Sequence, residues 1–109
     1  MATVIARFEP NKKDPGRGTV YYRIYKGHNR RMEFSSRIRL SASSWDETTK
    51  SVRGEDAEAC RLRAQMDADL ELLNQIIVED VDGCLTMGDM IELFKQRKIR
   101  IYLEHNKRY

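Results

Sequence analysis

Between Gly18 and Leu40 the sequence alternates between two kinds of side chain, and this alternation constrains how the segment can fold. Even-numbered positions are mostly apolar, whereas odd-numbered positions are mostly arginine, tyrosine or a hydroxyl residue. A period of two residues is typical of β-strands with one buried and one solvated face. The run Gly27-His28-Asn29 interrupts the pattern with turn residues, and Asn29 suits left-handed backbone. The segment therefore predicts an antiparallel hairpin.

A three-residue loop places Lys26 opposite Arg30 and so sets the register of the hairpin. On the face expected to be buried, the register pairs Ile24 with Met32, Tyr22 with Phe34 and Val20 with Ser36. On the solvated face, it pairs Tyr25 with Arg31, Arg23 with Glu33, Tyr21 with Ser35 and Thr19 with Arg37. A slip of one residue would mix the two sets, so the pattern favours this register.

The segments on either side of the hairpin supply another strand and two helices. Residues 3–9 alternate with the same parity and predict a third strand. From Glu55 to about Val81 the apolar spacing changes to 3.6 residues, which predicts a long amphipathic helix packed on the sheet. Thr86 followed by Asp89 resembles a capping box, and it predicts a second helix through about Lys98. We expect that short helix to lie too far from the sheet to join the first core.

The predicted fold class is therefore α+β, with a three-stranded antiparallel sheet packed on one long helix and followed by the first helix of a second helical domain. The expected boundaries are residues 1–81 for the first domain, 82–85 for a linker and 86–109 for the truncated start of the second. Trp45 stands in the polar connection after the hairpin. We expect it to cap the open end of the core.

Charge is segregated along the 109 residues, although the net charge is only +3. Residues 1–54 carry +7, residues 55–85 carry −7 and residues 86–109 carry +3. The basic potential thus belongs to the hairpin region, and such a patch favours an anionic partner. No apolar run approaches the roughly 20 residues of a membrane span, and no signal sequence opens the chain, so we expect a cytoplasmic protein without a membrane partner.

No catalytic or metal-binding constellation is apparent. Cys60 and Cys84 form no CxxC motif, and no pair of histidines lies near them. His28 and His105 have no nucleophile or carboxylate at motif spacing. Gly16-Arg17-Gly18 lacks the lysine and hydroxyl residue of a phosphate-binding loop. We therefore predict no catalytic residue, metal, cofactor or small-molecule ligand in this chain.

The basic aromatic face of the sheet is typical of a nucleic-acid interface, because arginine forks read guanine and β-ribbons can enter the major groove. The candidate residues on this face are Arg7, Thr19, Tyr21, Arg23, Tyr25, Arg31, Ser35, Arg37 and Arg39. Lys12, Lys13, Arg17 and Arg30 lie near the loop tips, where they suit phosphates.

Three other interpretations of the same residues remain open. Tyr21 and Tyr25 could stack unpaired bases, as on a single-strand or RNA platform. The acidic helix, with Asp67, Asp69 and Glu71, could instead be a docking surface for a protein partner. The third interpretation is that this face is basic because it is solvated, and that it binds no ligand.

An ordered set of short motifs resembles a known family. The set comprises Gly18 to Ile24, the turn Lys26-Gly27, Arg31, the run Phe34 to Leu40, and Trp45-Asp46 before the long helix. Together they resemble the amino-terminal arm-binding domain of tyrosine recombinases from mobile elements of Bacteroides-type bacteria. The resemblance covers about Val4 to Val81, and the segment from Thr86 is similar to the first helix of the core-binding domain that follows in those integrases.

The resemblance implies a sheet inserted in the major groove of double-stranded DNA at arm-type sites during DNA integration and recombination. It also implies other integrase protomers as partners and catalytic residues in a carboxy-terminal domain, so no enzyme activity is expected in this chain. The family usually has a small residue, glycine, where this sequence has Arg37.

Overall fold

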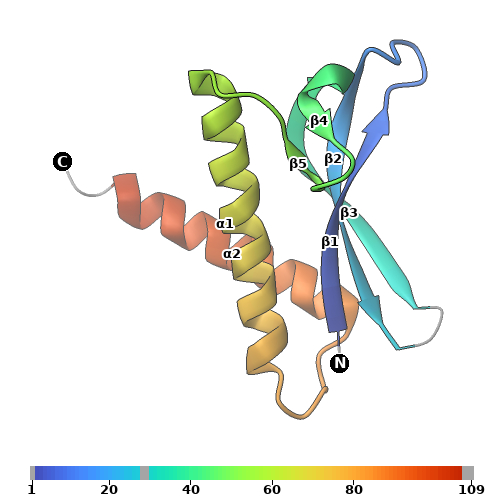
Figure 1. The fold of residues 1–109 in the computed structure, drawn as a ribbon. Helices are drawn as coiled ribbons and strands as arrows, with labels where there is room; N and C mark the ends of the chain where they lie inside the picture. The colour runs from blue at the N-terminus through green and yellow to red at the C-terminus, as the bar shows by residue number, and fades with distance from the viewer. Residues whose placement is uncertain (1, 28–29, 107–109) are drawn as a thin grey trace.

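The structure is a computed structural model that describes residues 2–27 and 30–106, and these residues form a three-stranded sheet, a two-stranded sheet and two long helices (Figure 1). The larger sheet is antiparallel, with the order β1 (Ala2–Pro10), β2 (Arg17–Lys26) and β3 (Arg31–Ser41). A 3-10 turn (Ala42–Ser44) leads to the smaller sheet of β4 (Trp45–Asp46) and β5 (Ser51–Val52), and the helices are α1 (Ala57–Glu79) and α2 (Met87–Asn106). The predicted α+β class and three-stranded antiparallel sheet are confirmed.

The hairpin register is confirmed from its turn to the middle of the strands. The amide of Lys26 donates to the carbonyl of Arg30 at 3.1 Å, and the predicted partners pair from Tyr25 with Arg31 to Tyr21 with Ser35. The predicted conformation of Asn29 falls outside the described residues.

Beyond Tyr21 a β-bulge shifts the register, so the predicted pair of Thr19 with Arg37 was wrong. Thr19 pairs with Arg39 instead, which leaves residues 36–38 of β3 opposite Val20 alone. Arg37 adopts left-handed backbone with φ +64°. Because the shift is two residues, the alternation survives, and Ile38 is buried while Arg37 and Arg39 are exposed.

Two serine side chains satisfy backbone groups at the bulge. The Ser35 hydroxyl accepts from the Arg37 amide at 3.0 Å. The buried Ser36 hydroxyl accepts from the Ile38 amide at 3.0 Å and donates to the Val20 carbonyl at 2.6 Å. Side chains that hydrogen-bond to nearby backbone groups can replace hydrogen bonds between strands, so this serine pair stabilises the bulge. The predicted one-to-one pairing of Val20 with Ser36 is not formed.

The inner face of the sheet packs on α1 to form the core. Val20, Tyr22 and Ile24 of the central strand are fully buried, together with Met66, Leu73 and Ile76 of α1. Trp45 is buried and stacks on Phe8 with ring centroids 6.0 Å apart, which confirms its predicted place at the end of the core. Met32 is 40% exposed, so its predicted burial was wrong. It lies near the start of an edge strand, where an inner-face side chain has a neighbouring strand on one side only.

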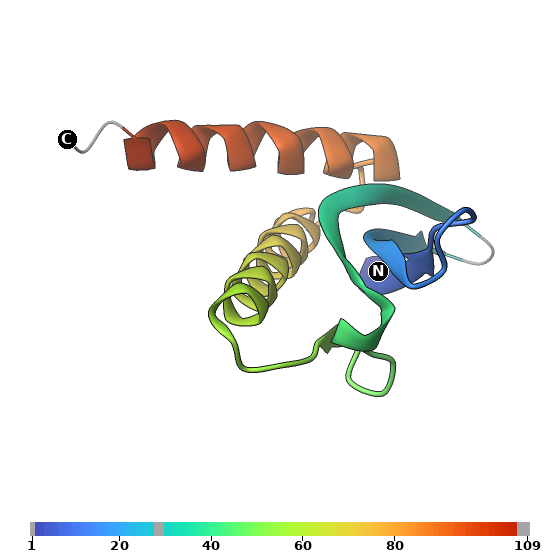
Figure 2. The ribbon, with the colours of Figure 1, turned by 90° about the horizontal axis from the view of Figure 1, so that it is seen from above.

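Helix α2 packs against both α1 and the sheet, contrary to the expectation that it would lie apart from the first core (Figure 2). Its residues Met90, Ile91 and Phe94 are buried in the same hydrophobic cluster as the sheet. The Phe94 ring lies 5.5 Å from that of Phe34 and 6.3 Å from that of Tyr22. Phe34 and Tyr22 thus form an aromatic surface beside α1 on which α2 packs. The domain boundary at residues 82–85 stays a prediction.

A buried polar network also joins α2 to the other two layers. Asp69 of α1 is 4% exposed, accepts from the Tyr22 hydroxyl at 2.7 Å and lies 3.0 Å from the ammonium of Lys98. Burial, aided by the bond to Asp69, raises the pKa of Tyr22. Asp69 is thus part of the core, so including it in an exposed acidic docking surface was wrong.

The ends of the helices follow their sequence signals. The Asp56 side chain caps α1 by accepting from the Ala59 amide at 2.7 Å. Thr86 and Asp89 exchange two hydrogen bonds of 3.0 Å, which confirms the predicted capping box. The helix nevertheless extends to Asn106, well past the predicted end at Lys98. Neither described helix is long and apolar enough to span a membrane.

Candidate nucleic-acid interface

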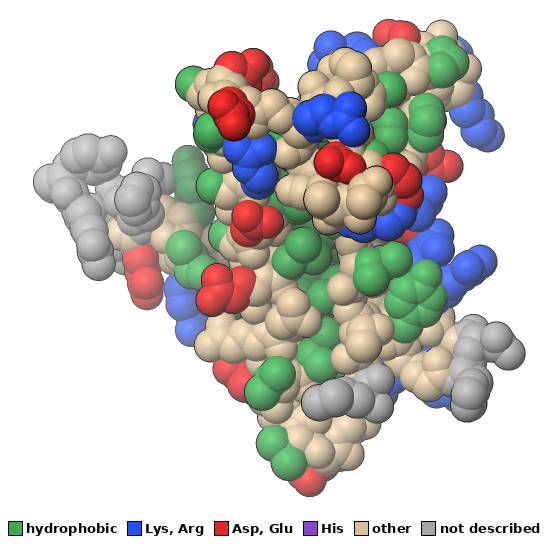
Figure 3. All heavy atoms as spheres, viewed as in Figure 1, with side chains coloured by type: hydrophobic (Ala, Val, Ile, Leu, Met, Phe, Trp, Pro, Cys, Tyr) green, Lys and Arg blue, Asp and Glu red, His purple; other side chains and the backbone are tan. Residues whose placement is uncertain are grey.

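The candidate interface is the outer face of the three-stranded sheet, opposite the face that packs on α1. Most of the predicted side chains on it are accessible: Arg31, Ser35, Arg37 and Arg39 are exposed, and Arg7, Thr19, Tyr21, Arg23 and Tyr25 are half-buried. Lys12 and Lys13 lie in the β1–β2 connection, Arg17 begins β2 and Arg30 immediately precedes β3; all four are exposed. Figure 3 shows Lys and Arg side chains along the side of the molecule formed by the sheet, with Asp and Glu side chains over α1.

Glu33 is the centre of a cross-strand network on this face. It accepts from Nε and an Nη of Arg7 on β1 at 2.9 and 2.8 Å, and from Nε of Arg23 on β2 at 2.8 Å. Glu9 accepts a further bond of 2.7 Å from Arg7. Two guanidinium groups from neighbouring strands are therefore held by carboxylates, and this part of the face has little net charge. We call Arg7, Arg23 and Glu33 the arginine clamp.

The clamp shifts the proton affinities of its members in opposite directions. Hydrogen bonds from Arg7, and to a smaller extent from Arg23, lower the pKa of Glu33 against the opposing effect of burial. The bond to Glu33 raises the pKa of Arg7. All three groups are consequently charged at neutral pH.

The two tyrosines of the outer face contact the clamp. The guanidinium of Arg7 lies over the Tyr21 ring, 5.8 Å from its centroid. The Tyr25 hydroxyl accepts from Arg23 at 3.2 Å. Both residues are half-buried, and each makes one of these contacts with an arginine of the clamp.

The remaining cations of the face differ from the clamp arginines. Within residues 2–27 and 30–106, the structure shows no ion pair to a carboxylate for Lys12, Lys13, Arg17, Arg30, Arg31, Arg37 or Arg39. Their charges are available to an external anion.

A hollow of about 300 Å³ lies at the bulged end of this face. It is lined by Thr19, Tyr21, Phe34, Ser35, Arg37, Arg39 and Lys95. All but Phe34 carry a polar or charged group, and Lys95 comes from α2.

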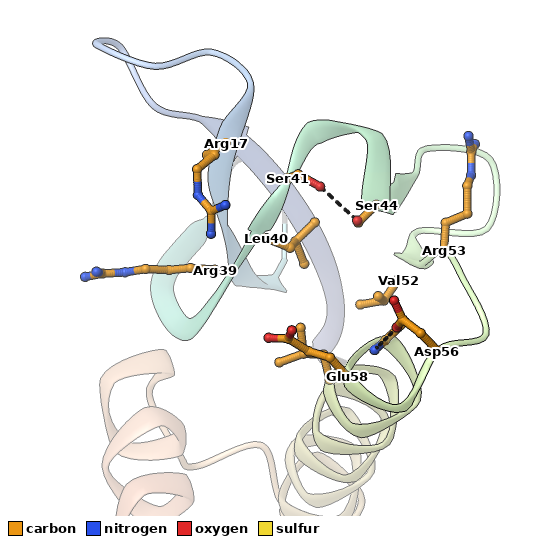
Figure 4. Close-up of a pocket in the computed structure, with 11 residues that line it drawn as sticks. Arg17, Arg39, Leu40, Ser41, Ser44, Val52, Arg53, Asp56 and Glu58 are labelled. Atoms are coloured by element: carbon orange, nitrogen blue, oxygen red, sulfur yellow. Dashed lines mark hydrogen bonds between the residues drawn. The ribbon is translucent and has the colours of Figure 1, made fainter.

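A smaller hollow of about 170 Å³ lies between this end of the sheet and the start of α1 (Figure 4). Arg17 and Arg39 stand on its sheet side, and Asp56 and Glu58 on its helix side. Asp56 already caps α1. Because both signs of charge line this hollow, it is a poor site for an anion.

Three residues of this face were not among the predicted candidates, although the predicted alternation already turned Glu33 and Ile5 outward. Glu33 was placed opposite Arg23 by the predicted register, so its part in the clamp was open to inference from sequence. Ile5 pairs with Arg23 and is 39% exposed on the outer face, where apolar side chains can contact a thymine methyl. Lys95 gave no such signal, since its position depends on how α2 packs.

Neither a candidate metal site nor a disulfide is found among the described residues. No group of three or more His, Cys, Asp or Glu side chains among them is arranged to hold a metal. Cys60 and Cys84, both within the described segments, are exposed and not joined by a disulfide. The side chains of His28 and His105 fall outside the described residues.

A family model matches most of this chain. The family model described as Arm DNA-binding domain matches residues 7–81, which include all of β2, β3 and α1 and stop before α2. Searches of curated proteins and of solved structures found no match. The family match covers well over half of the chain, and the chain therefore belongs to the Arm DNA-binding domain family, the arm-type DNA-binding domain of phage integrases.

Proposed function

We propose that this chain binds double-stranded DNA sequence-specifically by placing the outer face of its sheet in the major groove. In this role it is the arm-binding part of a site-specific integrase, acting on DNA in the bacterial cytoplasm. The arm-type domain is itself non-catalytic, and we propose that the parent is a tyrosine recombinase of a Bacteroides-type mobile element with its catalytic residues in another domain.

The arginine clamp is the observation that carries this proposal. Reading guanine requires a guanidinium fork in a defined orientation, because both acceptors must be met at once. Glu33 fixes the direction of both Arg7 and Arg23. Its bonds engage Nε and Nη2 of Arg7 and leave Nη1 to meet a base acceptor, so a bidentate contact with guanine requires a clamp bond to be exchanged for the base when DNA binds. A face built only for phosphates has no need of such orientation.

The surrounding free cations supply affinity for the duplex backbone. Lys12, Lys13 and Arg17 on one loop, and Arg30 and Arg31 at the other end of the sheet, flank the clamp. Cations at both ends can contact phosphates while the centre of the sheet faces the bases. Neutralising about six phosphates predicts a slope near −5 when the logarithm of the association constant is plotted against that of salt concentration.

A duplex selected from a random pool tests the proposal. We expect the selected duplex to bind more tightly than a scrambled duplex and a single strand, with steep salt dependence. Replacement of Arg23 or Tyr21 should reduce binding to the selected duplex more than replacement of Lys12 or Lys13. Equal losses on selected and random duplexes would contradict base reading by the sheet, and preference for the single strand would favour a stacking platform.

A further inference from the structure

The hollow at the bulge joins two parts of the molecule that are distant in sequence. Ser35, Arg37 and Arg39 reach it from β3, and Lys95 reaches it from α2. Lys95 lies outside the residues matched by the family model. Its position is set by the neighbouring Phe94, whose buried ring packs 5.5 Å from that of Phe34, another residue of the hollow.

The bulge determines how Arg37 is presented. Left-handed backbone is costly for a residue with a side chain, and such positions cluster at functional sites. Here a long basic side chain occupies one, at φ +64°. The Ser35 hydroxyl oxygen accepts from the Arg37 amide, so its own hydrogen is left to donate to a ligand in the hollow.

The charges around the hollow are not compensated within the described part of the chain. Arg37, Arg39 and Lys95 form no ion pair there, whereas Arg97 and Lys98 on the same helix bind carboxylates of α1 at 2.7 and 3.0 Å. Like charges gathered at one concave site repel one another and attract an anion. Guanidinium, ammonium and hydroxyl donors together match the oxygens of a phosphate.

We propose that this hollow binds a phosphodiester of the DNA backbone through Arg37, Arg39 and Lys95, so that α2 takes part in holding the DNA. The inference rests on the proposed function and extends it to a helix beyond the matched domain. The sheet then reads bases at the clamp while the hollow fixes the backbone at its bulged end.

The test compares two charge-removing variants of one helix. Lys95→Gln removes a cation from the hollow, and Arg100→Gln removes an exposed cation elsewhere on α2. We expect Lys95→Gln to weaken duplex binding roughly three- to tenfold near 0.1 M salt and to reduce the salt slope by about 1. Arg100→Gln should change neither appreciably, and Lys95→Arg should restore binding. Thermal unfolding of each variant checks that the fold is intact.

A neutral linkage identifies the ligand as a backbone phosphate. A series of selected duplexes is prepared, and each carries a single methylphosphonate linkage at a different backbone position. At the position that contacts the hollow, we expect the methylphosphonate to weaken DNA binding by the unaltered protein and to cause no further loss of binding by the Lys95→Gln variant. Titration with inorganic phosphate, followed by amide shifts at Ser35 and Arg37, should give only weak binding.

Each other result has a distinct meaning. Equal effects of Lys95→Gln and Arg100→Gln on DNA binding would overturn the proposed phosphate site while leaving the proposed function intact. The same conclusion would follow if, at every methylphosphonate position, the loss of affinity simply added to the loss caused by Lys95→Gln. Tight binding of inorganic phosphate without dependence of DNA affinity on Lys95 would overturn it as a DNA site. Failure of the unaltered chain to bind any duplex would overturn both proposals.

Discussion

Two regions of the sheet's outer face, the clamp and the bulge, hold their arginines in different ways. At the clamp, Glu33 bonds to both Arg7 and Arg23, which makes their directions definite and cancels part of their charge. At the bulge, Arg37 and Arg39 share a hollow with Lys95, and none of the three forms an ion pair within the described residues. Under the proposed function, the difference separates two requirements of DNA binding: orientation for reading bases, and uncompensated charge for binding the backbone.

Replacement of Arg23 by lysine should produce the largest change in DNA binding. Lysine retains the charge but cannot form the bidentate fork. Affinity for the selected duplex should fall about 10- to 100-fold, since one bidentate contact contributes about 1–3 kcal/mol, while affinity for random duplex stays nearly constant. Competition between the two duplexes measures this. If Lys12→Ala lowered the selectivity as much, the division between clamp and loop would be wrong.

Glu33→Gln should weaken selectivity by releasing both clamp arginines. The ratio of specific to random affinity should fall about tenfold, and random binding should tighten because a negative charge has been removed. Glu9→Gln is the matched control, since Glu9 bonds to Arg7 and not to Arg23, the other arginine of the clamp. Equal effects of the two substitutions would show that charge, and not orientation, is what Glu33 provides.

Arg37→Gly should separate stability from binding at the other end of the face. Glycine relieves the left-handed backbone, so the free energy of unfolding should rise by about 1 kcal/mol. Duplex affinity should fall roughly three- to tenfold through loss of one phosphate contact. Arg37→Ala is the control, because it removes the same side chain and keeps the strain. Denaturant unfolding and DNA titration of both variants distinguish the two effects.

Acid should remove the clamp's contribution to stability, which is the smallest effect expected. The pKa of Glu33 is lowered in the folded state from its ordinary value of 4.5, chiefly by Arg7. Its contribution is therefore complete above about pH 4.5 and is lost as the pH falls through the lower folded value. The difference in unfolding free energy between the unaltered chain and Glu33→Gln should be about 1 kcal/mol or less at pH 7 and vanish in acid. A difference that grew in acid would contradict the network.

Sequence reasoning predicted the strand pairing of this face well where it depended on alternation. The predicted partners from Tyr25 to Tyr21 are those observed, and the pairing of Arg23 with Glu33 already contained half of the clamp. The other half, from Arg7, required the alignment of β1 with β2, which the β1–β2 connection did not specify. The family resemblance singled out Arg37 as unusual, and the positive φ at that residue explains why glycine is suited to the position.

The sequence by itself determined the strands, their two faces and most of the register, the long helix and the cap of α2, because alternation, helical period and capping are local. Only the tertiary structure decided the bulge, the burial of Asp69 and the placement of Lys95. Each depends on groups distant in sequence. The Ser36 hydroxyl bonds across the sheet to Val20 at the bulge. Tyr22 and Lys98 bond to the buried Asp69, and Phe94 packs on Phe34 next to Lys95. The basic face is thus encoded locally, whereas the hollow at its end exists because α2 packs against the sheet.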